Sequence, residues 1–107
     1  MKKIKLKLSY DDMTIMDCIL EVHAQMPDEI PGSDAKMEAA QAAEILYRIR
    51  GVVRMIFSKP KMFSLSLSEA YFMEKLLGHY MNSALRNNHF AMSRMASIQL
   101  QLQPKLP

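Results

Sequence analysis

The side chains best suited to bind a ligand in this sequence are eight basic residues in two groups. One group alternates along the start of the chain and the other follows residue 46: Lys3, Lys5 and Lys7, then Arg48, Arg50, Arg54, Lys59 and Lys61. If the two groups meet in space, they form a patch that can neutralise several phosphates, with an affinity that falls steeply with salt. Against this, the lysine tract lacks the aromatic residues on which single-stranded bases stack. The alternative is a solvated helix end whose bases complement the helix macrodipole.

Residues that could support catalysis are scarce. Cys18 precedes His23 by five residues, a spacing that turns the two side chains away from each other on a helix. Cys18 also lies among apolar residues, which favours a buried structural thiol. The three histidines have no histidine four residues away and no carboxylate at ligand spacing, and there is no glycine-rich phosphate loop. We therefore predict a protein that is not an enzyme and has no catalytic residues and no cofactor.

The eleven methionines are a second unusual feature of the composition. His89, Met92 and Met95 follow one another at intervals of three and would project to one side of a helix, as a soft ligand set suited to Cu(I). Methionine more often fills irregular gaps in cores and interfaces, and nothing else in the chain indicates metal handling. We therefore predict no metal site.

The overall composition is that of one small globular domain. The 107 residues are 50% hydrophobic and 23% charged, which suffices for one core and argues against disorder, so we expect a single domain over residues 1–107. The single cysteine cannot form an internal disulfide, and a cytoplasmic location is the default. Lys5 and Lys7 interrupt any signal-peptide core, and no apolar run reaches about 18 residues, so we expect no membrane association.

Charge is strongly segregated along the chain, although the net charge is only +3. Residues 10–46 contain nine acids and one lysine, whereas residues 47–61 contain five bases and no acid. Such segregation favours contact with a polyanion, or attraction between oppositely charged faces of two copies. A bipolar surface without any partner is the alternative.

Three tracts alternate apolar and polar residues, which predicts short strands near 3–8, 63–67 and 98–103. Helices are predicted near 10–26, 34–58 and 68–86, with a further one possible near 88–96. Ser9 with Asp12 forms a capping-box variant at the first helix, and Ser68 with Glu69 opens the third. Pro27 ends the first helix, a loop is expected over residues 28–32, and Asn87 with Asn88 is a plausible helix end.

The longest periodic signal is the helix expected over residues 34–58. Its apolar residues alternate at intervals of four and three, at Ala35, Ala39, Ala42, Leu46, Ile49, Val53 and Ile56. Its second half is apolar over more than one face, so we expect other elements to sandwich it. The fold class is therefore α+β: a two-layer domain in which three or four helices cover one face of a small sheet.

These features favour a non-enzymatic protein–protein interaction or assembly module that self-associates, with a dimer as the favoured form or another protein as partner. The reasons are the surplus of apolar helix surface and the polar sheet edges left open for pairing. The alternative is a small basic nucleic-acid-binding or regulatory protein that uses the eight basic residues.

Overall fold

The computed structural model describes residues 3–25, 35–83 and 85–107, so the loop predicted over residues 28–32 lies outside the described residues. The predicted α+β class is confirmed, with four helices and a two-stranded sheet in place of the expected three strands. The elements are β1 (Lys3–Leu8), α1 (Tyr10–Gln25), α2 (Ala35–Val52), β2 (Lys61–Ser66), α3 (Leu67–Met81), α4 (His89–Leu102) and a short 3₁₀ turn, η2 (Gln103–Lys105).

The two strands form an antiparallel ribbon with one buried and one exposed face. Ile4 lies opposite Leu65 and Leu6 opposite Phe63, and these side chains are buried. The alternate residues of β1, Lys3, Lys5 and Lys7, are exposed. The alternation predicted for the first two tracts is thus confirmed, because a ribbon solvated on one side buries every second residue.

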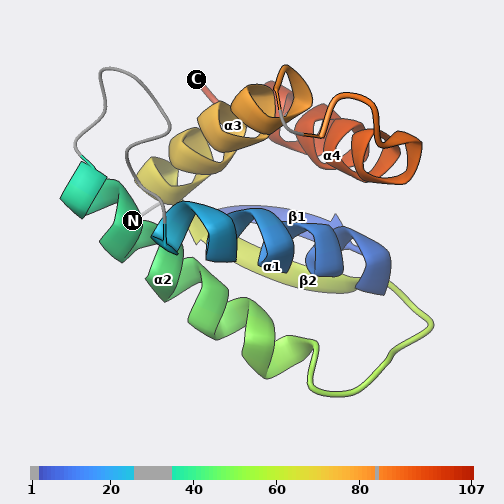
Figure 1. Cartoon of the computed structure of the whole chain (residues 1–107). Helices are drawn as coiled ribbons and strands as arrows, with labels where there is room; N and C mark the ends of the chain where they lie inside the picture. The colour runs from blue at the N-terminus through green and yellow to red at the C-terminus, as the bar shows by residue number, and fades with distance from the viewer. Residues whose placement is uncertain (1–2, 26–34, 84) are drawn as a thin grey trace.

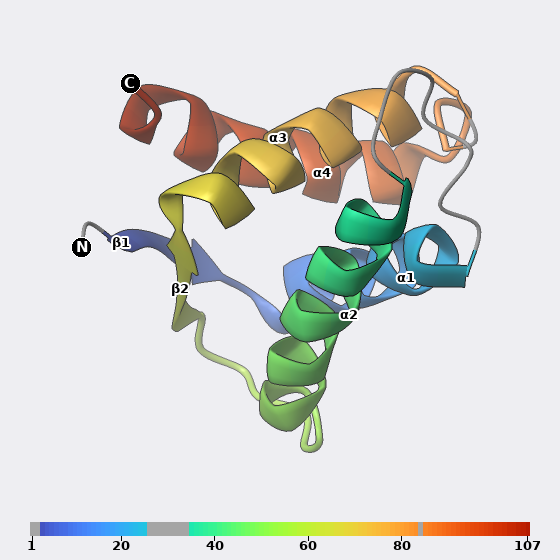
Figure 2. The same cartoon turned by 90° about the vertical axis from the view of Figure 1, so that its left-hand side faces the viewer.

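The helices pack as two pairs against the buried side of the ribbon (Figure 1). α1 packs most extensively against α2, and α3 packs against α4. α4 also contacts α1 and β1, while α3 contacts β2, so the pairs close around one core. Figure 2 shows α2 in front of α1, on the outside of this arrangement. Within the described ranges, no helix combines the length and the apolarity needed to cross a membrane.

Each strand is followed directly by a helix, and a capping box stabilises the start of both helices. At α1, the Ser9 amide donates to Asp12 Oδ2 at 3.1 Å and the Asp12 amide donates to Ser9 Oγ at 3.0 Å, which confirms the predicted cap. At α3 the cap is Ser66 with Glu69, two residues before the serine that we expected. Each box satisfies two amides that a helix start would otherwise leave unpaired.

The prediction of a third strand over residues 98–103 is wrong, because these residues form the end of α4 and the start of η2. The buried residues of α4 are Ala91, Met95, Ile98 and Leu102, which follow helical spacing. Leu100, which a strand would bury beside them, is 73% exposed. A tract of five alternating residues contains an i, i+4 pair and therefore fits a helix face as well as a strand face.

Two helix ends also differ from the prediction. α2 ends at Val52 and not near residue 58, because Gly51 and the β-branched Val52 and Val53 are weak helix formers. Beyond them Met55 is 79% and Ile56 82% exposed, so no buried face extends the helix, and α2 is not sandwiched as expected. α3 ends at Met81 and not near residue 86.

α4 begins at His89 and runs past residue 96, where the short helix was expected to stop. Asn88, predicted to end a helix, begins this one, because its side chain accepts a hydrogen bond from the Ala91 amide at 3.0 Å.

The outer edge of β1 is bonded by a side chain of α4 in place of the missing third strand. Gln101 Oε1 accepts from the Lys7 amide and Gln101 Nε2 donates to the Lys7 carbonyl, both at 2.7 Å. One carboxamide therefore makes the two bonds that a neighbouring strand would make to this residue.

Replacing Gln101 by alanine should lower the free energy of unfolding by about 1–2 kcal/mol, because two hydrogen bonds to backbone are lost. Urea unfolding measures this change. Gln103→Ala, an exposed glutamine two residues on, is the matched control and should change stability by less than about 0.5 kcal/mol. Equal effects of the two substitutions would show that the Gln101 bonds contribute nothing to the fold.

Candidate interaction surfaces

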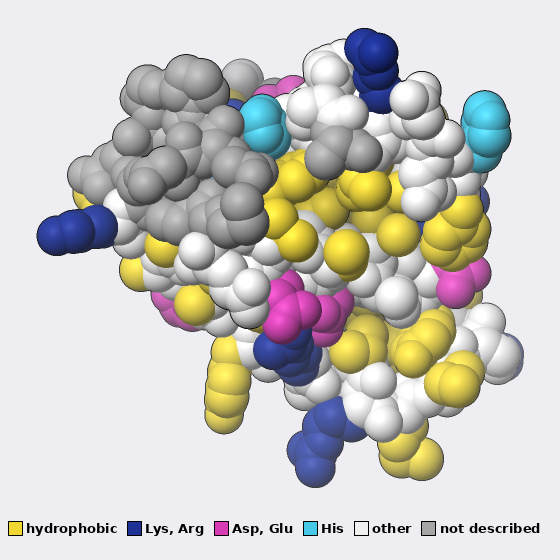
Figure 3. Space-filling view, viewed as in Figure 1, with side chains coloured by type: hydrophobic (Ala, Val, Ile, Leu, Met, Phe, Trp, Pro, Cys, Tyr) yellow, Lys and Arg dark blue, Asp and Glu magenta, His cyan; other side chains and the backbone are white. Residues whose placement is uncertain are grey.

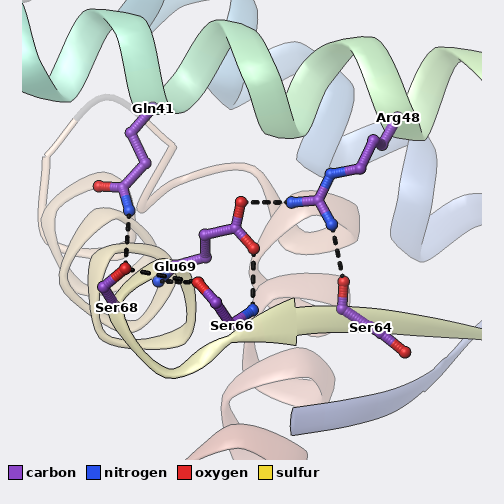
Figure 4. A network of polar contacts seen from close by, with 6 residues as sticks. All are labelled: Gln41, Arg48, Ser64, Ser66, Ser68 and Glu69. Atoms are coloured by element: carbon purple, nitrogen blue, oxygen red, sulfur yellow. Dashed lines mark hydrogen bonds and ion pairs between the residues drawn. The ribbon is translucent and has the colours of Figure 1, made fainter. Parts of the chain in front are cut away.

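A polar network fixes one flank of α2 to the junction between β2 and α3 (Figure 4). Arg48 Nη2 lies 2.5 Å from Glu69 Oε2, and Arg48 Nη1 donates to the Ser64 carbonyl at 3.0 Å. Glu69 Oε1 in turn accepts from the Ser66 amide at 2.8 Å. A single carboxylate thus caps α3 and holds the arginine that bonds the outer edge of β2.

Glu69 is nearly buried, and its surroundings favour the charged form. Burial by itself would raise the pKa of Glu69, but the Ser66 amide, the Arg48 guanidinium and the Ser66 hydroxyl together lower this pKa below its ordinary value. The carboxylate is therefore ionised at neutral pH and remains a partner for Arg48.

The opposite flank of α2 is tied to α1 by a second arginine. Arg50 Nε lies 3.2 Å from Asp17 Oδ2, and Arg50 Nη2 lies 3.2 Å from Glu21 Oε1. Hydrogen bonds to Asp17 and then Glu21 raise the pKa of Arg50 above its ordinary value. Figure 3 shows acidic and basic side chains in contact where these two helices meet.

Between these two flanks, α2 presents an outward face that no described element covers. Tyr47 is 82% exposed at mid-helix. Beside its ring, a surface hollow of about 680 Å³ is lined by Ala43, Leu46, Tyr47, Arg48, Arg50, Gly51 and Arg54. The hollow exists because the residues one turn before and one turn after Tyr47, Ala43 and Gly51, carry almost no side chain.

A second hollow, of about 770 Å³, lies on the flank that carries the polar network. Most of its lining residues are polar or charged, and they come from β1, α2, the end of β2 and the start of α3: Lys3, Met37, Ala40, Gln41, Glu44, Arg48, Ser66, Ser68 and Glu69. It holds hydroxyl groups but neither a histidine nor a cysteine, and its one buried carboxylate is already paired with Arg48. These groups supply no activated nucleophile.

The structure does not gather the eight predicted basic residues into one patch. Lys3 and Arg48 both line the second hollow, and Lys5 lines a separate hollow with Lys3 and Lys105. Arg48 and Arg50 are engaged by acids of the same chain. The remaining residues are exposed at separate places: Lys7 on β1, Arg54 and Lys59 after α2, and Lys61 above the Phe57 ring at 4.6 Å.

Cys18 is exposed and not buried as expected, because its neighbours Ile19 and Leu20 take the positions that face the core. In the soft ligand set, Met95 is buried in the core while His89 is exposed, so these two side chains do not share a surface. Within the described parts of the chain, no three His, Cys, Asp or Glu side chains are placed to hold a metal ion.

The sequence did not indicate a polar link that joins three helices. His23 is buried at the end of α1, and its Nε2 lies 3.2 Å from Glu38 Oε1 of α2. The other oxygen of Glu38 accepts from Lys75 Nζ of α3 at 2.7 Å. The residues are far apart in sequence, so neither helical spacing nor a local motif could have revealed the contact.

Replacing Glu69 by glutamine should reduce stability at neutral pH by about 1–2 kcal/mol and flatten its pH dependence. Because the folded-state pKa is lowered, the ionised group stabilises the fold above the ordinary value of 4.5, and this contribution is lost as pH falls through the folded-state pKa. Urea unfolding from pH 7 downward, at one protomer concentration, measures the effect.

Glu74→Gln on the same helix is the control, because Glu74 is partly exposed and away from Arg48. Parallel stability–pH curves for wild type and Glu69→Gln would contradict the role assigned to Glu69.

No family model, curated protein or solved structure matches this chain. We therefore derive a function from the surfaces of the molecule itself.

Proposed function

We propose that the protein is a non-enzymatic interaction module that self-associates through the outward face of α2. One observation carries this proposal: the exposed ring of Tyr47 and the hollow bordered by Ala43 and Gly51 lie side by side on one helix. An anchor next to a hollow is self-complementary, because the ring of one copy can enter the hollow of another. Symmetric dimers use such isologous contacts.

The chemistry of this face suits a protein partner. Tyrosine and methionine are enriched at protein interfaces, and tyrosine is a frequent hot-spot residue. Met37 near the start of α2, and Met55 and Ile56 just after it, are also exposed. Met37 lines the second hollow, so the exposed apolar residues that favour an interaction site near the Tyr47 face are Tyr47 itself and, just after α2, Met55 and Ile56.

The sheet edges, which first suggested strand pairing between copies, do not support it. On β1, Gln101 bonds both backbone groups of Lys7, and Lys105 Nζ donates to the Lys5 carbonyl. On β2, Arg48 bonds the Ser64 carbonyl. These contacts occupy part of the backbone on both outer edges and hinder the addition of a further strand there, so we assign self-association to the helix surface.

An α2 contact is short, since 18 residues span about 27 Å, and we expect a dissociation constant in the range of about 1–100 µM. Light scattering over this concentration range should show a mass that rises towards that of a dimer. Tyr47→Ser should weaken dimerisation at least about tenfold, because the central anchor is lost. A monomer mass at every concentration would end the proposal.

Leu100→Ser is the matched control for Tyr47→Ser. Leu100 is also a large, exposed apolar residue on a helix, but it belongs to α4. It should leave dimerisation unchanged, and an equal loss in both variants would point to general apolar exposure instead of the α2 face.

A second candidate is nucleic-acid binding by the open face of the ribbon. The lysines of β1 lie on one exposed face at a repeat of about 7 Å, set by two residues of strand rise. Many acids of the described residues are held in ion pairs elsewhere: Asp12, Asp17, Glu21, Glu38 and Glu69. The ribbon face is therefore basic and has few acids to oppose an approaching phosphate.

This candidate predicts binding to a DNA or RNA oligonucleotide at low salt, with a logarithmic affinity that falls linearly with logarithmic salt. The triple variant Lys3→Gln, Lys5→Gln, Lys7→Gln should reduce the magnitude of the slope by about 3. Lys36→Gln with Lys59→Gln, away from the ribbon face, should change it less. An absence of binding at low salt would end this candidate.

A further inference from the structure

We infer that two copies pair through α2 in antiparallel order, with Tyr47 of one copy packed on Gly51 of the other and Glu44 beside Arg54 of the other. This inference rests on the proposed self-association and specifies its geometry.

The first observation is the open space beside Gly51, the penultimate residue of α2. Gly51 lies inside the helical part of α2, where glycine is less favourable than alanine. A Cβ built on Gly51 would meet no heavy atom within 4 Å, so nothing within the chain needs the space. The free space lies on the outward face, one helical turn from the exposed Tyr47 ring.

The second observation is the order of four residues along one stripe. Glu44, Tyr47 and Gly51 follow at intervals of three and four on one side of α2. Arg54, three residues further on in the turn after α2, lines the same hollow as Tyr47 and Gly51. Tyr47 and Gly51 lie two residues to either side of position 49, and Glu44 and Arg54 lie five to either side. A two-fold axis at the level of position 49 would therefore place each Tyr47 ring against Gly51 of the other copy. It would also place each Glu44 beside Arg54 of the other copy.

The third observation is that the charges of this stripe are not used within the chain. Arg48 and Arg50 are engaged by Glu69 and by Asp17 with Glu21. Glu44 and Arg54 are both exposed and have no ion pair among the described residues. They are thus available to a partner.

Charge and dipole both select the antiparallel order. A parallel pair would place Glu44 beside Glu44, Arg54 beside Arg54 and ring against ring. Antiparallel order pairs opposite charges and also opposes the two helix macrodipoles. A second copy of this chain is therefore the partner whose surface fits all four positions.

An exchange of charges tests this geometry. Glu44→Arg and Arg54→Glu should each weaken homodimerisation about tenfold, measured by analytical ultracentrifugation, because each variant sets like charges together at both ends of the contact. Mixed with each other, the two single variants should form heterodimers above the random proportion, and the double variant should regain wild-type affinity. Arg86→Glu, an exposed arginine between α3 and α4, is the control and should dimerise as wild type.

Gly51→Leu tests the packing step by itself. Leucine should raise the melting temperature of the dilute monomer, since it favours the helix and meets open space, yet it should weaken dimerisation about tenfold because it occupies the place of the Tyr47 ring. This combination excludes misfolding as the cause.

The outcomes separate the inference from the function on which it rests. A monomeric wild type would overturn both. A wild-type dimer that is insensitive to Gly51→Leu and to both charge variants would overturn the antiparallel register and leave self-association standing. Weakened single variants without heterodimer preference or rescue would also overturn the pairing of Glu44 with Arg54.

Discussion

One carboxylate joins α2 to β2 and α3, while α2 packs mainly against α1. Glu69 caps α3 through the Ser66 amide and at the same time holds Arg48, which reaches the outer edge of β2. Nearly buried ion pairs are costly to desolvate and contribute only when hydrogen bonds satisfy the remaining lone pairs and protons. Here the backbone of Ser66 and the carbonyl of Ser64 supply such bonds. The same contacts connect helix, strand and helix cap, so one side chain takes part both in the start of α3 and in the docking of α2.

This constraint also determines which face of α2 is exposed. Arg48 and Arg50 are two residues apart and therefore point about 200° apart around the helix. One is held by Glu69 and the other by Asp17 and Glu21, so the helix is clamped on both flanks. The stripe from Glu44 to Arg54 lies between the flanks, opposite the buried Ile45 and Ile49. The outward direction of Tyr47 thus follows from the contacts of Arg48 and Arg50 on the two flanks of the helix.

Sequence reasoning succeeded where the signal was local and failed where it depended on distant partners. The alternation of β1 and the box of Ser9 with Asp12 are local and were predicted correctly. The tract from Ile98 to Leu102 fitted both the strand period and the helix period. The helix was decided by contacts outside the tract: the cap at Asn88 that begins α4, and the bonds of Gln101 to the edge of β1. The pairing of Arg48 with Glu69 spans 21 residues, so no spacing rule could reveal that this arginine is engaged within the chain. The exposed stripe of α2 can be read from the sequence, but the spacing of the buried apolar residues of the same helix, such as Ile45 and Ile49, gives a stronger periodic signal.

The outward face of α2 and the lysine face of the ribbon differ in the force that would drive binding. Binding at one surface can therefore be measured separately from binding at the other. Salt screens the row of lysines on the ribbon, so any contact made there weakens as ionic strength rises. In the proposed α2 contact, the Tyr47 ring would bury apolar surface over Gly51 of the other copy. Salt does not screen this apolar contribution, and sulfate or phosphate strengthens it. Only the end pairs of the proposed α2 contact, Glu44 with Arg54, respond to screening. A dimer held mainly by its apolar centre would therefore persist at ionic strengths that release a polyanion from the ribbon, so the two proposed activities are compatible on one small domain.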